Sequence, residues 1–144
     1  MNPIATLATV TVFSLTASFA AFAQDATAAA GVSRAEVLAT GTNVVGAPIA
    51  YPTGAAMVTA EMVTFEPEGQ TALHQHPVPS FVYVLEGELE VRIEGKEPMR
   101  FTPGQAFVEP QDTDLQAFNV ADGPTKVLVV YSGAEGGKNT VASQ

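Results

Sequence analysis

Apolar and polar residues alternate along several short stretches of this 144-residue chain, and no stretch shows the three- to four-residue spacing of an amphipathic helix. The alternation predicts strands, separated by turn-forming glycine, proline and acidic residues, over 57–65, 89–93, 99–101, 106–109, 115–120 and 126–131. A weaker alternation indicates an additional first strand over 36–40. Short strands separated by frequent turns are typical of a sandwich or barrel, so we expect an all-β fold.

The stretch Phe81–Leu85 is apolar at every position and does not alternate. A strand of this kind is typically buried on both faces. One face would line the interior of the barrel, and the other would need a second sheet layer or a partner subunit to cover it. We therefore expect a homodimer.

Residues 1–23 have the pattern of a secretory signal peptide. No charged residue occurs between Ile4 and Ala23, and Ala21-Phe22-Ala23 before Gln24 is a small-x-small cleavage site, although no Lys or Arg precedes the apolar run. The alternative is an uncleaved membrane anchor, but several Thr and Ser residues dilute the apolar run. We expect cleavage, a periplasmic or secreted protein, and no stable membrane association afterwards.

The remaining chain is long enough for one domain with a core. We expect a flexible leader over 24–33, which is rich in alanine, and a barrel domain over 34–132. Residues 133–144 contain Gly136-Gly137 and few apolar residues, which predicts a disordered tail.

Charge and cysteine content exclude some functions. Six Lys and Arg residues stand against fifteen Asp and Glu residues, which gives a formal net charge of −9. A surface of this sign disfavours nucleic acid and anionic membranes as partners. The chain has no cysteine, so disulfides and thiolate metal ligands are excluded.

The two histidines of the chain, His74 and His76, are one residue apart. On a strand, residues two apart share one face and lie about 7 Å apart. Two imidazoles at this spacing can bind one transition metal ion, and they can equally bind an organic acid or hydrogen-bond each other and water.

The sequence around these histidines resembles the cupin superfamily. The first cupin motif, a glycine, His-x-His, an acidic residue and a second glycine, aligns with Gly69, His74, His76, Ser80 and Gly87. The second motif, Pro-x4-His-x3-Asn, aligns with Pro110, Leu115 and Asn119. The resemblance implies a double-stranded β-helix, or jelly-roll barrel, whose metal ion (Fe, Mn, Ni, Cu or Zn) is held by three imidazoles and one carboxylate.

This chain departs from the family pattern at two ligand positions. Ser80 stands where the acidic ligand belongs, and Leu115 stands where the third histidine belongs. We therefore expect at most a weakly bound divalent transition metal at His74 and His76, with Ser80 and Leu115 beside it in the ligand-binding site. Asn119 is expected to hold the last turn by hydrogen bonds.

Two classes of function remain open. The first is an exported binding protein that holds a small polar molecule in the barrel, with His74 and His76 as its contacts. The second is a metal-dependent cupin enzyme of the dioxygenase, isomerase or decarboxylase type. The sequence identifies neither a substrate nor a reaction.

Overall fold

The computed structural model describes residues 31–143, and the chain divides into two units, 1–34 and 35–144. The predicted signal peptide and most of the predicted leader lie outside the described residues. Within the first unit only residues 31–34 are described, and they contain no strand. All the strands belong to the second unit. Across residues 31–143 no helix is long and apolar enough to cross a membrane.

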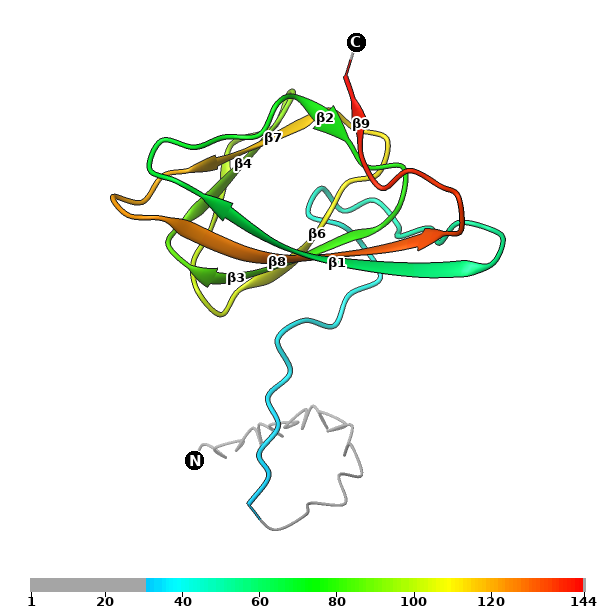
Figure 1. Ribbon diagram of the computed structural model, residues 1–144, viewed down its shortest axis with the longest axis horizontal. Helices are drawn as coiled ribbons and strands as arrows, with labels where there is room; N and C mark the ends of the chain where they lie inside the picture. The colour runs from blue at the N-terminus through cyan, green and yellow to red at the C-terminus, as the bar shows by residue number, and fades with distance from the viewer. Residues whose placement is uncertain (1–30, 144) are drawn as a thin grey trace, which may run out of the picture. The chain divides into compact units, whose positions relative to one another are not determined.

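The second unit consists of two antiparallel sheets (Figure 1). One sheet has the strand order β1-β8-β3-β6 and the other has the order β5-β4-β7-β2-β9. The strands are β1 (Ala56–Phe65), β2 (His74–Gln75), β3 (Ser80–Glu86), β4 (Leu89–Ile93), β5 (Met99–Phe101), β6 (Ala106–Glu109), β7 (Leu115–Asn119), β8 (Thr125–Ala134) and β9 (Val141–Ala142). This arrangement confirms the predicted all-β jelly roll.

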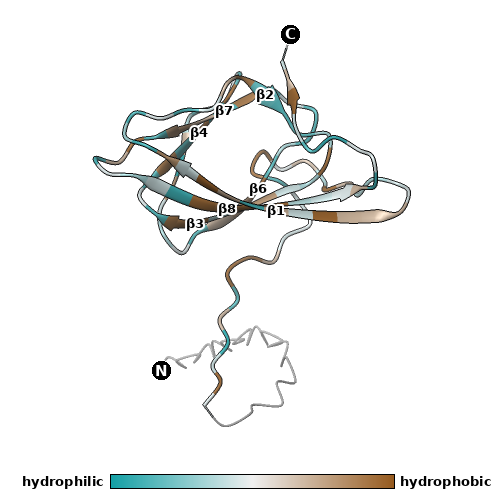
Figure 2. Ribbon diagram, viewed as in Figure 1, coloured by the Kyte–Doolittle hydropathy of each residue, from teal (hydrophilic) through white to brown (hydrophobic). Residues whose placement is uncertain are grey.

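The core lies between the two sheets and is built from the inward residues of alternating strands. On β8, buried and half-buried residues alternate along the whole strand, so Val127, Val129 and Tyr131 point inward. The facing sheet contributes Leu89 and Leu115, both almost fully buried. Apolar segments accordingly run along β4, β7 and β8 (Figure 2). Full burial of such a side chain contributes about 1.5–3 kcal/mol each.

Strand β3 differs from the prediction of burial on both faces. Val82 and Val84 are buried, whereas Phe81 and Tyr83 are half-buried and Leu85 is 42% exposed. The outer face of this sheet has no complete second layer in the described chain. The segment before β1 bonds to the edge strand β6, from the Val44 amide to the Val108 carbonyl (2.9 Å). It covers only a part of the outer face, where Leu38, Ile49 and Tyr51 line a shallow pocket with Phe81.

The segment beyond residue 132 also differs from the predicted disordered tail. Strand β8 continues to Ala134, and β9 pairs with β2, with His74 opposite Ala142 and Gln75 opposite Val141. The two-residue strand β2 would otherwise be a sheet edge with unpaired backbone groups, and β9 covers that edge. Near the N-terminal end of the described chain, the strand expected over 36–40 does not form, and most side chains of residues 36–40 are exposed.

Asn119 holds the last turn, as predicted. Its amide nitrogen donates to the carbonyls of Phe65 (3.2 Å), Glu66 (3.0 Å) and Gly123 (2.8 Å). Its carbonyl oxygen accepts hydrogen bonds from the Ala121 amide and the Thr125 hydroxyl. One buried side chain therefore ties the end of β1 to the β7–β8 turn.

Candidate functional site

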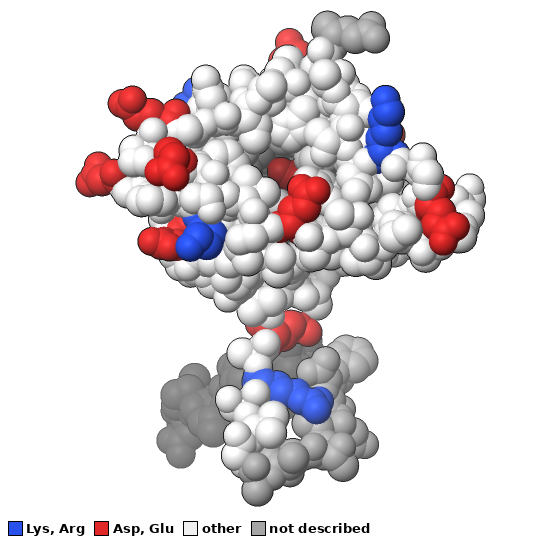
Figure 3. All heavy atoms as spheres, viewed as in Figure 1, with Lys and Arg blue, Asp and Glu red and all other residues white. Residues whose placement is uncertain are grey.

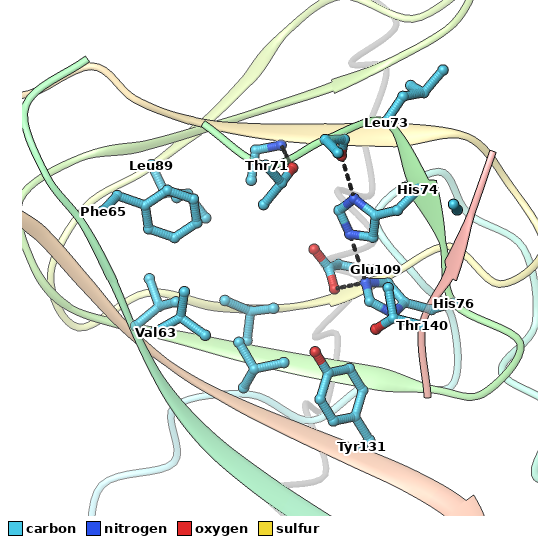
Figure 4. Close-up of a pocket in the computed structure, with 16 residues that line it drawn as sticks. Val63, Phe65, Thr71, Leu73, His74, His76, Leu89, Glu109, Tyr131 and Thr140 are labelled. Atoms are coloured by element: carbon cyan, nitrogen blue, oxygen red, sulfur yellow. Dashed lines mark hydrogen bonds and ion pairs between the residues drawn. The ribbon is translucent and has the colours of Figure 1, made fainter. Parts of the chain in front are cut away.

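A cavity of about 450 Å³ lies inside the barrel. Figure 4 shows polar side chains at one end, including His74, His76, Glu109, Tyr131 and Thr140, and apolar side chains such as Val63, Phe65 and Leu89 at the other. The polar end is formed by β2, β6, the inner face of β8 and the segment leading into β9. The site is therefore assembled from both sheets.

The structure brings the two histidines together. His74 lies on β2 and His76 directly follows it, and their rings meet edge to face with centroids 4.8 Å apart. Their Nε2 atoms are 3.1 Å apart. His76 is almost fully buried, whereas His74 is half-buried at the cavity wall.

A third group, Glu109, completes this end of the cavity. Its side chain is 7% exposed, and its Oε2 atom lies 3.1 Å from Nε2 of His76. The sequence reasoning missed this residue and treated it only as the end of a strand. A signal was present: alternation on β6 places Glu109 on the same face as the buried Phe107, and an acid on a core face is unusual.

Ser80 and Leu115, the other two predicted ligand-binding residues, have different surroundings. The Ser80 hydroxyl is fully buried and donates to Oε2 of Glu109 (2.6 Å), so it holds the carboxylate. Leu115 is the Cα partner of His74 across β7 and β2, but it is buried in the core and Ala117, two residues further on, lines the cavity.

Backbone carbonyls fix the tautomer of both imidazoles. Nδ1 of His74 lies 2.8 Å from the carbonyl oxygen of Ala72, and Nδ1 of His76 lies 2.8 Å from that of Asn139. Because a carbonyl oxygen only accepts, each Nδ1 carries the hydrogen and donates it. In the neutral rings each Nε2 atom then carries a lone pair and no hydrogen. The two Nε2 atoms lie next to each other, and that of His76 also lies next to the Glu109 carboxylate.

Such a group of acceptors requires a positive charge among them. Burial alone lowers the pKa of His76, but its hydrogen bond with Glu109, the charge of that carboxylate and the Asn139 carbonyl together raise the pKa above its ordinary value. Protonated His76 then donates from Nε2 toward Glu109 and His74. Burial raises the pKa of Tyr131, and the charges of Glu61 and Glu109 add to this, so its hydroxyl stays neutral at pH 7.

The donor types suit a transition metal, although in their present positions no three or more His, Cys, Asp or Glu side chains of residues 31–143 could hold one metal ion together. His74, His76 and Glu109 are instead linked in a row by two contacts of 3.1 Å each. Two ligands bound about 2.1 Å from a metal at right angles to each other are about 3.0 Å apart, which is close to both contacts. The remaining nitrogen of each imidazole donates to a carbonyl, as in most protein metal sites.

Comparison with known families agrees with the fold. A family model described as "Cupin domain" matches residues 61–131, a stretch that contains both histidines and Glu109. The chain belongs to the cupin superfamily. This stretch reaches from within β1 to within β8 and therefore includes six of the nine strands, β2 to β7, completely.

Solved cupin structures resemble this domain. The DMSP lyase DddQ from Ruegeria pomeroyi shares 28% identity at a TM-score of 0.52, over 68% of this chain and 47% of that chain. A recombinant oxalate oxidase in complex with glycolate shares 27% identity at a TM-score of 0.52, over 59% of this chain and 45% of that chain. The Lactobacillus farciminis oxalate decarboxylase shares 22% identity at a TM-score of 0.52, over 59% of this chain and 26% of that chain. At this identity the likeness concerns the fold alone.

The cupin domain described here spans less than half the length of these solved structures. Among curated proteins no match to the chain is found.

Proposed function

We propose that this cupin domain binds a divalent transition metal through His74, His76 and Glu109 and holds a small organic molecule beside it in the cavity. The observation that carries the proposal is the convergence of three acceptor atoms, with both Nδ1 hydrogens already committed to carbonyls. Two histidines and one carboxylate with open positions are typical of non-haem Fe(II) sites.

Glu109 makes metal binding more favourable than the sequence predicted from His74 and His76 alone. With only two neutral imidazoles, nothing in the site offsets the charge of a divalent cation. A buried carboxylate supplies both a third ligand and a negative charge, and the Ser80 hydroxyl holds it in place. Since the family's third imidazole is absent, coordination positions remain open for a ligand.

In this arrangement the chain's own residues orient the reacting groups. The carbonyls of Ala72 and Asn139 fix the rings, and the neutral Tyr131 hydroxyl stands at the polar end of the cavity. A bound divalent metal supplies Lewis-acid polarisation of a ligand oxygen. The apolar walls exclude water from the bound molecule.

Metal titration of the purified chain tests the proposal. Calorimetry with Mn(II), Zn(II) and Fe(II), the last under anaerobic conditions, should give one site per chain. Glu109→Gln should weaken binding by roughly tenfold or more, as loss of a metal-site carboxylate does. Glu94→Gln is the matched control, because Glu94 is exposed after β4 and does not line the cavity. Equal affinity of Glu109→Gln and wild type would remove Glu109 from the site.

A metal-dependent enzyme is the second candidate. It is favoured by the identity of 27% to an oxalate oxidase and 28% to a DMSP lyase. Incubating the metal-loaded protein with oxalate or DMSP and following both compounds by NMR tests these two reactions. Turnover that disappears in His76→Ala would establish an enzyme, and recovery of both compounds unchanged would exclude these two activities.

We also propose that residues 1–23 are removed on export to the periplasm or medium. The uncharged run and the Ala21-Phe22-Ala23 site support this proposal. Intact mass of the protein from the envelope fraction should correspond to a chain that begins at Gln24. A product that retains Met1 would contradict it.

We further propose a homodimer through the outer face of the β1-β8-β3-β6 sheet. This face exposes 66% of Val58, 58% of Met62 and 42% of Leu85, next to the half-buried Phe81 and Tyr83. Light scattering should give twice the chain mass, and Met62→Glu should give monomers. A wild-type protein that is monomeric at high concentration would exclude the dimer.

A further inference from the structure

The walls of the cavity show what kind of molecule fits beside the polar cluster. Its apolar part is contributed by both sheets: Val63, Phe65, Val82, Leu89, Ala117, Val127 and Val129. The ionisable groups gather at the other end, and the hydroxyl of Thr71, which lies nearer to Leu89, accepts a hydrogen bond from the Ala117 amide (Figure 4). A volume of about 450 Å³ has room for roughly fifteen water molecules, and is within the usual range of small-molecule sites.

The positive charge that a protonated His76 brings to the cavity lining is already paired with Glu109. Glu109 is part of the same lining, and none of the lining residues is Lys or Arg. The carboxylate of Glu61 acts on Tyr131 from β1 together with Glu109. On the face shown in Figure 3 acidic side chains lie in and beside the hollow, and the basic ones lie away from it.

A dicarboxylate therefore fits this cavity poorly. One carboxylate of such a molecule can meet a metal ion at the polar end. The second would lie against apolar side chains without a cationic partner, and an unpaired charge in such surroundings is costly. An uncharged apolar body buries its surface against the same walls favourably.

We propose that the cavity selects a compact, mainly apolar, uncharged molecule with one oxygen function, such as a hydroxyl or carbonyl, directed at His74, His76 and Glu109. This inference rests on the proposed function for the identity of the polar end. The sequence predicted a small polar ligand. The cavity instead favours a mainly apolar one, because the walls that would enclose most of the ligand are apolar.

The test compares probes of similar size that differ in charge, on the purified chain in the presence of a metal chelator. Benzyl alcohol should bind at least about tenfold more tightly than benzoate by ligand-observed NMR titration, and oxalate should not bind. Ala117→Leu, which fills part of the cavity, should weaken benzyl alcohol binding by about tenfold or more. Ala106→Leu is the matched control, because Ala106 lies on β6 and does not line the cavity.

Val63→Phe gives the same test from β1 if Ala117→Leu does not fold, since Val63 is only half-buried and lines the cavity. Benzoate or oxalate binding as tightly as benzyl alcohol would overturn the inference, and so would unchanged binding in both cavity-filling variants. Because the metal is chelated, these outcomes do not depend on metal binding. Absence of metal binding in the calorimetric titration would instead overturn the proposed function alone.

Discussion

Ser80 and Glu109 are direct cross-strand partners on β3 and β6, and the buried serine hydroxyl donates a 2.6 Å hydrogen bond to the carboxylate. In the cupin motif the acidic ligand belongs at the position of Ser80. Here the carboxylate comes from the strand next to it, and the serine supports it. The carboxylate beside His76 thus comes from a different part of the chain than the family motif would supply.

The first prediction exchanges these two residues. Glu109→Ser should weaken Mn(II) or Zn(II) binding by about 10–100-fold, whereas Ser80→Glu combined with Glu109→Ser should recover most of it, because the pair keeps its volume and charge. Calorimetric titration of the three proteins measures this. If the double variant binds no better than Glu109→Ser, the two positions do not reach the same metal.

The second prediction concerns Leu115, which lies opposite His74 in the β2–β7 pair. Leu115→His should raise metal affinity by about tenfold or more, and should destabilise the metal-free protein by about 1–3 kcal/mol through the buried imidazole. Thermal melting with and without metal measures both effects, since a bound metal raises stability.

Gln116→His is the control for this experiment, because residue 116 points to the face of β7 opposite to that of Leu115. A metal-dependent rise in melting temperature that is equal in wild type and Leu115→His would show that the added imidazole does not reach the ion.

The third prediction separates backbone strain from steric clash at two glycines. Gly87 has φ +78°, and a Cβ there would lie 2.2 Å from Oγ1 and 2.7 Å from Cα of Thr125. Gly95 has φ +71° with nothing within 4 Å of such a Cβ. Gly95→Ala should cost about 1–2 kcal/mol of unfolding free energy, and Gly87→Ala should cost at least about 2 kcal/mol more. Urea denaturation measures both, and equal losses would refute the clash.

The fourth prediction concerns Glu90, which accepts hydrogen bonds from Arg92 (2.7 Å) and Arg100 (2.8 Å). The Arg92 hydrogen bond, together with Arg100 and the charges of both guanidinium groups, lowers the pKa of Glu90 despite its burial. A carboxyl with a lowered folded-state pKa stabilises the protein above its unfolded pKa of about 4.3. This contribution disappears as the pH falls through the folded-state pKa.

Wild type should therefore lose more unfolding free energy than Glu90→Gln on acidification below about pH 4.3. Urea denaturation across that range measures the difference. Glu94→Gln, at an exposed position after β4, is the control and should follow wild type. Parallel pH curves for Glu90→Gln and wild type would show that the arginines add no stability through this carboxylate.

The sequence by itself determined the class of fold, the position of most strands, the pairing of His74 with His76 and the role of Asn119. The fold class, the strands and the histidine pair depend on alternation, turn residues and short spacings, which are local properties of the chain, whereas the role of Asn119 was expected from its place in the motif. Alternation also indicates which face of its own strand a residue occupies, as it does for Glu109 on β6.

Only the tertiary structure decided which strands are neighbours. The pairing of β3 with β6 places Glu109 next to Ser80 and His76, from which it is separated by 29 and 33 positions. The pairing of β9 with β2 brings the Asn139 carbonyl to His76 across 63 residues. A strand's own sequence specifies its faces but not its partner, because backbone hydrogen bonds between strands are the same whichever strand supplies them.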